Sequence, residues 1–246
     1  DALALPEQTF LTRYVQLKPA EMKIYKALKR NSVVELETGN VTATTVLTKL
    51  LRLQQLTGGF LQEDEADKPE FVSDAKIKAL EEILDDYVLE CGKKLVVFCR
   101  FRTEIALIEQ LLSKKKIQYG LIYGDVRGDI VKDFQENPET KVFLAQIDTA
   151  GLGITLTAAD TCVYYSVNYN YAAYSQSLAR IHRIGQKNKC TYIHLVCEDT
   201  VDEKVLAADN MFRRWRTEVK RLLCPGENTL KVYFHSPIKV DLPKYD

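Results

Sequence analysis

The stretch LVVFC, at residues 95–99, is a continuous apolar run between the lysines at 93–94 and Arg100. A short apolar run bounded by polar residues is typical of a strand that is buried on both faces, as in a parallel sheet. Four similar runs follow it along the chain: YGLIY at 119–123, KVFLA at 141–145, TCVYY at 161–165 and TYIHLV at 191–196. The spacing of these runs therefore decides the class of fold.

Segments long enough for helices separate most of these runs, at 102–115, 127–136 and 170–183. Strands that alternate with helices predict right-handed βαβ units and a parallel sheet with helices on both faces. We therefore expect an α/β fold. A last helix is expected from about residue 201 to 223, because Thr200 and Glu203 form a capping-box pattern at its start.

Residues 1–73 have a different pattern, with no strand-like run. KPAEMKIYKALKR, at 18–30, places Pro19 in a first helical turn, and a second amphipathic segment at 40–57 leads to Gly58 and Gly59. We expect a helical extension at 1–73, an α/β lobe at 74–224 that begins with a helix capped by Ser73, and a C-terminal tail at 225–246.

Composition limits the function classes. Lysine plus arginine equals aspartate plus glutamate, at 34 each, so the molecule as a whole has no basic field to attract nucleic acid. No apolar run reaches the ~18 residues of a membrane span, and the N-terminus lacks signal-peptide features. These features predict a cytoplasmic protein without a membrane partner. The six cysteines are irregularly spaced, which favours reduced core thiols over zinc ligands or disulfides.

The segment after the third run, QIDTAGLGITLTAAD at 146–160, contains candidate ligand-binding residues. Gly151 and Gly153 would let backbone N–H groups approach a phosphate or a sugar, and Thr155 adds a hydroxyl. The alternative is an ordinary strand-to-helix turn, in which glycine and threonine are common.

A second candidate is SLARIHRIGQ, at 177–186. On a helix over 170–183, Gln176, Arg180 and Arg183 would lie within about 60° of one another. The arginines have planar guanidinium groups suited to phosphate, and no acidic residue lies at helical spacing from them. The alternative is a solvated helix face. His182 points off this stripe, and we expect it to pack or to hydrogen-bond.

The pattern Gln176-xxx-Arg180-xx-Arg183-Ile-Gly-Gln186 resembles motif VI of superfamily-two helicases, and HRIGQ resembles the Swi/Snf branch of DNA-dependent ATPases. Further segments resemble the other motifs of that branch in order: KLVVFCRF at 94–101, YGLIYGD at 119–125, AGLGITLTAAD at 150–160 and DTVDEKVL at 199–206. LPEQ, at 5–8, resembles the connector that leads into the second lobe. The resemblance covers most of the chain and implies a second RecA-like lobe.

The resemblance implies roles for individual residues. Arg183 would be the arginine finger for ATP hydrolysis, Arg180 would assist it, and Gln176 would position the arginines or a water molecule. Gly151 and Gly153 would approach the nucleotide, whereas Gly124, Arg127 and Thr155 would contact the backbone of single- or double-stranded DNA. ATP and Mg²⁺ would be held mainly by the N-terminal RecA-like lobe, because this chain has no GKT or GKS phosphate loop and no metal ligands are expected in it.

Other features qualify the resemblance. The letters DEAD at 64–67 follow no buried strand, so we interpret them as coincidence. Ala179 and Ala150 depart from the Swi/Snf pattern, and the segment 124–134 is short, so we expect a bacterial or phage helicase or translocase and not a chromatin remodeller. Two alternatives remain: an inactive RecA-like module that binds nucleic acid or protein, and a free-standing nucleotide enzyme.

Overall fold

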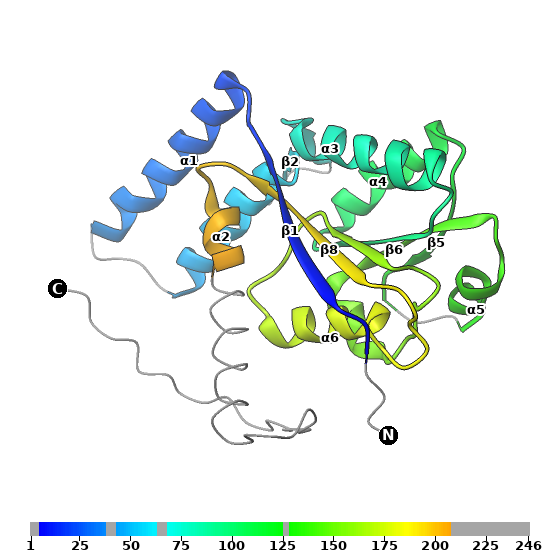
Figure 1. Ribbon diagram of the computed structural model, residues 1–246. Coiled ribbons are helices and arrows are strands. Elements are labelled where there is room, and N and C mark those ends of the chain that lie inside the picture. The colour runs from blue at the N-terminus through cyan, green and yellow to red at the C-terminus, as the bar shows by residue number, and fades with distance from the viewer. Residues whose placement is uncertain (1–4, 38–42, 63–67, 125–127, 208–246) are drawn as a thin grey trace, which may run out of the picture.

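The computed structural model describes residues 5–37, 43–62, 68–124 and 128–207. Within these residues, six strands form one sheet in the order β1-β8-β7-β4-β6-β5, and every neighbouring pair is parallel (Figure 1). The strands are β1 (Gln8–Val15), β4 (Leu95–Cys99), β5 (Gln118–Ile122), β6 (Thr140–Gln146), β7 (Thr161–Tyr164) and β8 (Cys190–Cys197). The α/β prediction is confirmed, and each of the five apolar runs forms a strand.

Helices cover both faces of this sheet (Figure 1). One face carries α3 (Ala75–Ile83), the π-helical turn η1 (Leu84–Glu90) and α4 (Arg102–Lys114); the other carries α5 (Gly128–Glu136), the 3-10 helix η2 (Ile147–Leu152) and α6 (Tyr171–Ile181). Strand β4 is buried on both of its faces. The first core contains Leu95, Val97 and Cys99, and the second contains Val96 and Phe98. A strand buried on both faces needs no polar alternation.

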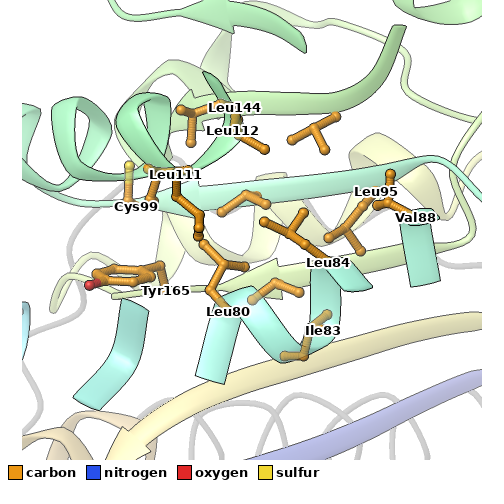
Figure 2. Packing of buried hydrophobic residues seen from close by; sticks show 14 of the residues in the cluster. Leu80, Ile83, Leu84, Val88, Leu95, Cys99, Leu111, Leu112, Leu144 and Tyr165 are labelled. Atoms are coloured by element: carbon orange, nitrogen blue, oxygen red, sulfur yellow. The ribbon is translucent and has the colours of Figure 1, made fainter. Parts of the chain in front are cut away.

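The core of the first face is drawn in Figure 2. Leu80 and Leu84 pack against Leu111 and Leu112 of α4, over Leu95 of the central strand. All five side chains are buried. Dense packing of this kind holds α3 and α4 in fixed positions on the sheet.

The expectation that residues 1–73 contain no strand is wrong. Strand β1 lies at one edge of the main sheet and pairs with β8 from Gln8↔Cys190 to Val15↔Cys197. Its sequence QTFLTRYV mixes polar with apolar residues because an edge strand remains partly exposed; Leu11 and Tyr14, for example, are exposed. The first segment of the chain therefore contributes a strand to the sheet, and a short hairpin of β2 (Phe60–Leu61) and β3 (Glu70–Phe71) as well.

The helical part of the extension packs at the carboxyl end of the sheet. Helix α1 (Pro19–Glu37) begins at the predicted proline, and α2 (Ala43–Thr57) ends at the predicted glycines. They share a core with Cys197, Val201 and Val205, and the backbone N–H of Val201 donates to the hydroxyl of Tyr25 at 2.7 Å. Residues 201–207 are helical, as expected, while the remainder of that helix and the tail lie outside the described residues.

The cysteines described by the structure are free thiols: Cys91 is exposed, and Cys99, Cys162, Cys190 and Cys197 are buried. Cys224 and the DEAD letters at 64–67 lie outside the described residues. Among the helices of the described ranges, none is both long enough and apolar enough to span a bilayer.

Candidate functional site

Arg180 lies in the last turn of α6. That helix is capped by the Asn170 side chain, which accepts the N–H groups of Ala172 and Ala173, and it buries Tyr174 and Ile181 in the core. Arg180 is therefore held on the flank of the helix with only 8% of its surface exposed. Its Nη1 donates to the Ile154 carbonyl at 3.3 Å, whereas its buried Nε has no partner in the described part of the chain.

Arg183 lies just beyond the helix. The expected helix over 170–183 ends at Ile181, because His182 takes up a non-helical conformation, with φ −90° and ψ 80°. The guanidinium of Arg183 is exposed to solvent, and its Nη1 donates to the Gly153 carbonyl at 3.2 Å. The three-residue stripe is thus a helical pair, Gln176 and Arg180, followed by an arginine on a turn. Gln176 is exposed one helical turn before Arg180.

Two positive charges therefore lie side by side, and neither has a counter-ion in the described part of the chain. Burial lowers the pKa of Arg180, and the nearby charge of Arg183 lowers it further. No carboxylate within the described ranges forms an ion pair with either arginine. A buried cation that lacks a partner is costly to the fold, and an anion placed between the two guanidinium groups would relieve that cost.

The crossover between β6 and β7 forms the other side of this site. Gly153 ends η2 with φ 72°, a conformation that favours glycine, and a Cβ placed there would meet no atom within 4 Å. The open space in front of Gly153 is next to the carbonyl that holds Arg183. Thr155 is half-buried in the same crossover. Gly151 lies within η2, and its contacts fall outside the described part of the structure.

Gln186 connects the turn that carries Arg183 to the crossover between β6 and β7. Its Nε2 carries two N–H groups and lies 2.8–3.3 Å from the carbonyl oxygens of Thr157, Ala159 and Ile181, and its Oε1 accepts the N–H groups of Lys187 and Asn188. His182 adds a tie to the N-terminal segment, with Nε2 2.7 Å from the Pro6 carbonyl, so the expected hydrogen-bonding role is confirmed. The turn that presents Arg183 is therefore rigid, and the sequence alone did not reveal that role for Gln186.

Of the expected DNA-contacting residues, Thr155 lies in this crossover and the other two lie outside it. Gly124 follows the carboxyl end of β5 with φ 82° and open space at its Cα, whereas Arg127 is outside the described residues. Gly124 and Thr155 lie, as expected, on the connections that follow two neighbouring strands, β5 and β6. Close by, the Arg102 guanidinium lies 5.6 Å from the centre of the exposed Tyr123 ring.

A buried polar network occupies the carboxyl edge of the sheet, which is the usual place for a ligand in such folds. The Glu104 Oε2 accepts the backbone N–H groups of Arg100 and Phe101 at 3.0 Å each, and the hydroxyl of Ser166 at 2.5 Å. The Arg100 guanidinium bonds to Gln54 of α2. Burial raises the pKa of Glu104 to about 7. We did not identify Glu104 from the sequence, because a glutamate in a helix is ordinarily solvated.

A buried ion pair adjoins this network. Lys76 of α3 is 2.7 Å from Asp202, and Asp202 also accepts the hydroxyl of Thr57 at 2.8 Å. Burial opposes the charge on Lys76, but Asp202 reverses that effect and leaves its pKa raised. These contacts join α2, α3 and the segment after β8, so this part of the edge is filled by the protein itself.

The chain resembles known proteins over both its sequence and its fold. Residues 75–185 match the family model for the helicase conserved C-terminal domain. A second model, the galactose-binding domain-like region of glycosyl hydrolase 2, matches residues 196–246. The described part of that second match is the end of β8 and the helical segment at 201–207, which belong to the same sheet and core as the rest of the chain.

Curated relatives include the chromatin-remodeling ATPase INO80 of Drosophila melanogaster, 31% identical over 70% of this chain and 10% of that protein. An uncharacterised ATP-dependent helicase of Mycoplasma genitalium is 27% identical over 95% of this chain and 22% of that protein. The chain thus spans less than a quarter of the length of these relatives. Because they include chromatin-remodelling ATPases of eukaryotes, the expectations of a bacterial or phage source and against a remodeller gain no support.

Solved structures share the fold. The C-terminal part of the Fun30 ATPase domain has a TM-score of 0.70 at 16% identity, covering 83% of this chain and 89% of that one. The SWI2/SNF2 ATPase core of Sulfolobus solfataricus, solved in complex with dsDNA, has a TM-score of 0.67 at 24% identity, covering 90% of this chain and 47% of that one.

The sheet order, the helical layers and these structural matches define a RecA-like α/β fold. The segment from 75 to 185 is similar to the helicase conserved C-terminal domain.

Proposed function

We propose that this chain is the second motor lobe of an ATP-dependent DNA helicase or translocase, in which Arg183 acts as the arginine finger. One observation carries the proposal: two neighbouring guanidinium groups lack a carboxylate partner in the described part of the chain, and one of them keeps a buried N–H without an acceptor. The rigid turn beside the open space at Gly153 presents these groups to a ligand.

A transferring phosphoryl group suits this arrangement. Its equatorial oxygens gain negative charge in the transition state, and guanidinium groups stabilise that charge most strongly where water is excluded. Arg183 would reach the phosphoryl group, the buried Arg180 would complete the positive field, and the exposed Gln176 would position a water molecule or the arginines. Gly153, with Gly151 before it, would let the nucleotide approach the backbone closely.

A companion lobe would hold the remaining parts of the nucleotide. The sequence has no GKT or GKS phosphate loop, and the described residues contain no cluster of three acidic, histidine or cysteine side chains that could hold a metal ion. We therefore assign the β- and γ-phosphates and Mg²⁺ to an N-terminal RecA-like lobe. The longer relatives, which are named as ATPases or as an ATP-dependent helicase, support this division.

Other residues of the lobe would contact the DNA. Gly124, Arg127 and Thr155 would contact the backbone of a DNA strand, which gives affinity without base specificity. The structural neighbour solved with dsDNA supports a DNA partner. Closure of the two lobes around ATP would change this grip and convert hydrolysis into movement.

The test replaces Arg183 in the longer protein that carries both lobes. Arg183→Ala should lower DNA-stimulated ATP turnover by roughly 10³-fold or more, because an arginine finger contributes about 10³ to 10⁵ in rate. The thermal midpoint should not change, because the side chain is exposed and its only described bond is to Gly153.

Lys187→Ala is the matched control, because it removes an exposed cation four residues further along. This control should keep the wild-type turnover. Full turnover in the Arg183→Ala protein would contradict the proposal and would favour an inactive RecA-like module. The isolated chain should hydrolyse no ATP, and appreciable ATP binding by this chain alone, measured by titration calorimetry, would favour the free-standing nucleotide enzyme.

A further inference from the structure

A basic stripe runs along the outer side of α1. It consists of Lys23, Lys26 and Arg30, all of which are exposed. At 100° per residue they lie within about 60° of one another around the helix axis. Pro19, Met22 and Ala27 lie beside them and line, together with the three cations, an open hollow on this helix.

The packing of α1 fixes the direction of the stripe. The opposite side of the helix buries Glu21 and Tyr25, and Leu28 packs against the same core. The hydroxyl of Tyr25 holds the backbone of Val201 at 2.7 Å. The stripe must therefore point away from the body of the protein, and Figure 1 shows α1 projecting from the sheet beyond the end of β1.

The three cations have no counter-ion among the residues that the structure describes. At the start of the same helix, Lys18 lies 2.8 Å from Asp74 and 3.8 Å from Glu21. Across the described ranges, no carboxylate comes within ion-pair distance of the three stripe residues. In a chain whose lysines and arginines equal its acidic residues in number, three adjacent unpaired cations are a local concentration of charge.

We infer that this stripe binds the phosphate backbone of duplex DNA, as a contact separate from the residues of the proposed function. With a rise of 1.5 Å per residue, the cations span about 10 Å along the helix, so they form a short linear array. The hollow beside them offers no aromatic anchor for a base or for a peptide side chain. Such a surface fits a linear polyanion and reads no sequence.

The stripe follows the strand at one edge of the sheet, and the proposed DNA contact at Gly124 follows the strand at the other edge. Helix α1 follows the carboxyl end of β1, and Gly124 follows the carboxyl end of β5 at the opposite edge. Five strand spacings of ~4.8 Å place these ends roughly 24 Å apart. That distance is about seven base pairs of B-DNA at 3.4 Å per pair. This inference rests on the proposed function only in taking DNA as the partner.

The experiment measures binding of the 246-residue chain to two 20-base-pair duplexes of unrelated sequence, by fluorescence anisotropy over a range of salt concentrations. The stripe variant is K23A/K26A/R30A. The matched control, K78A/K114A/K132A, removes the same charge from exposed positions on α3, α4 and α5. The thermal midpoint of each variant checks that it is folded.

The stripe variant should bind both duplexes at least tenfold more weakly at low salt. Its plot of log K against log salt should be less steep by about 2.7, because each phosphate contact contributes ~0.9 to the slope. The control should keep the slope of the wild-type chain. Equal slopes in the stripe variant and the wild-type chain would overturn the inference, and so would a stripe variant that loses only binding to polyglutamate, which would identify an acidic polypeptide as the partner.

Failure of the proposed function gives a different result. If the stripe variant binds DNA like the wild-type chain while Arg183→Ala still abolishes ATP turnover in the longer protein, the stripe inference is wrong and the motor assignment stands. If the wild-type chain binds neither duplex at the lowest salt, the DNA grip assigned to this lobe fails, and the stripe inference fails with it.

Discussion

The flank of α6 and the carboxyl edge of the sheet both contain buried charged groups, but they satisfy them differently. At the edge, the charged atoms of Glu104 and Lys76 have partners from several elements, and only one carboxylate oxygen of Glu104 lacks one. On the flank, Arg180 has a single carbonyl partner and a charged neighbour of the same sign. The contacts at the edge therefore hold the fold together, whereas in the proposed function the flank receives an anion.

The edge network should make the stability depend on pH. Burial raises the pKa of Glu104 to about 7, above its ordinary value of 4.5. Below pH 4.5 the carboxyl group is protonated in both the folded and the unfolded states. As the pH rises from 4.5 to 7, only the unfolded state loses the proton, so the free energy of unfolding should fall, by about 3 kcal/mol in total at ~1.4 kcal/mol per unit.

Chemical denaturation of the wild-type chain and of Glu104→Gln at several pH values between 4.5 and 7.5 measures this effect. The glutamine cannot ionise, so the difference between the two proteins isolates the carboxyl group from all other titrating residues. Parallel curves for the two proteins would mean that Glu104 titrates normally, and the edge would then not be a closed interior network.

A glycine tests how tightly the edge is packed. A Cβ at Gly58 would lie 2.3 Å from Glu104 Oε1, so Gly58→Ala must displace a buried carboxylate. We expect a loss of about 2 kcal/mol in the free energy of unfolding. The control is Gly92→Ala, where φ is +65° but no atom lies within 4 Å, so only backbone strain of about 1 kcal/mol is expected.

Denaturant titration of both variants, at a pH above 7 where Glu104 is ionised, gives the comparison. If Gly58→Ala were no more destabilising than Gly92→Ala, the carboxylate would have room to move, and the contrast between a filled edge and an open flank would weaken.

Replacing Arg180 on the flank of α6 should cost little stability, in contrast to the substitution at Gly58. Arg180→Met keeps a long side chain but removes a buried charge whose Nε has no partner. The free energy of unfolding should change by less than about 1 kcal/mol, because an apolar side chain of similar length avoids the cost of burying an unpaired charge. In the longer protein, the same substitution should reduce ATP turnover.

Denaturant melts and ATPase assays on the same variant separate the two effects. A large loss of stability in Arg180→Met would show that Arg180 serves the fold and is not held ready for a ligand. Retained stability together with full ATP turnover would leave Arg180 outside the nucleotide site.

The main elements could be predicted because each has a local cause. The run at 95–99 forms β4 with unchanged bounds, and the proline at 19 and the glycines after 57 mark where α1 begins and α2 ends. Strand β1 was missed because its partner is β8, 182 residues away at Gln8↔Cys190, and an edge strand lacks the apolar run that identifies a buried one. The helix over 170–183 was predicted two residues too long at its C-terminus, because the bonds of Gln186 and His182 to distant carbonyls set that end.

The sequence by itself determined the α/β class, the positions of the five buried strands after residue 94 and the choice of arginines as candidates, because apolar periodicity and side-chain chemistry are local properties. Tertiary structure decided that Arg180 is buried and Arg183 is exposed, that Gly153 meets the arginine turn, and that Glu104 lies in the interior. The physical reason is that burial and unsatisfied hydrogen bonds depend on neighbours brought together from distant parts of the chain, and no local pattern records them.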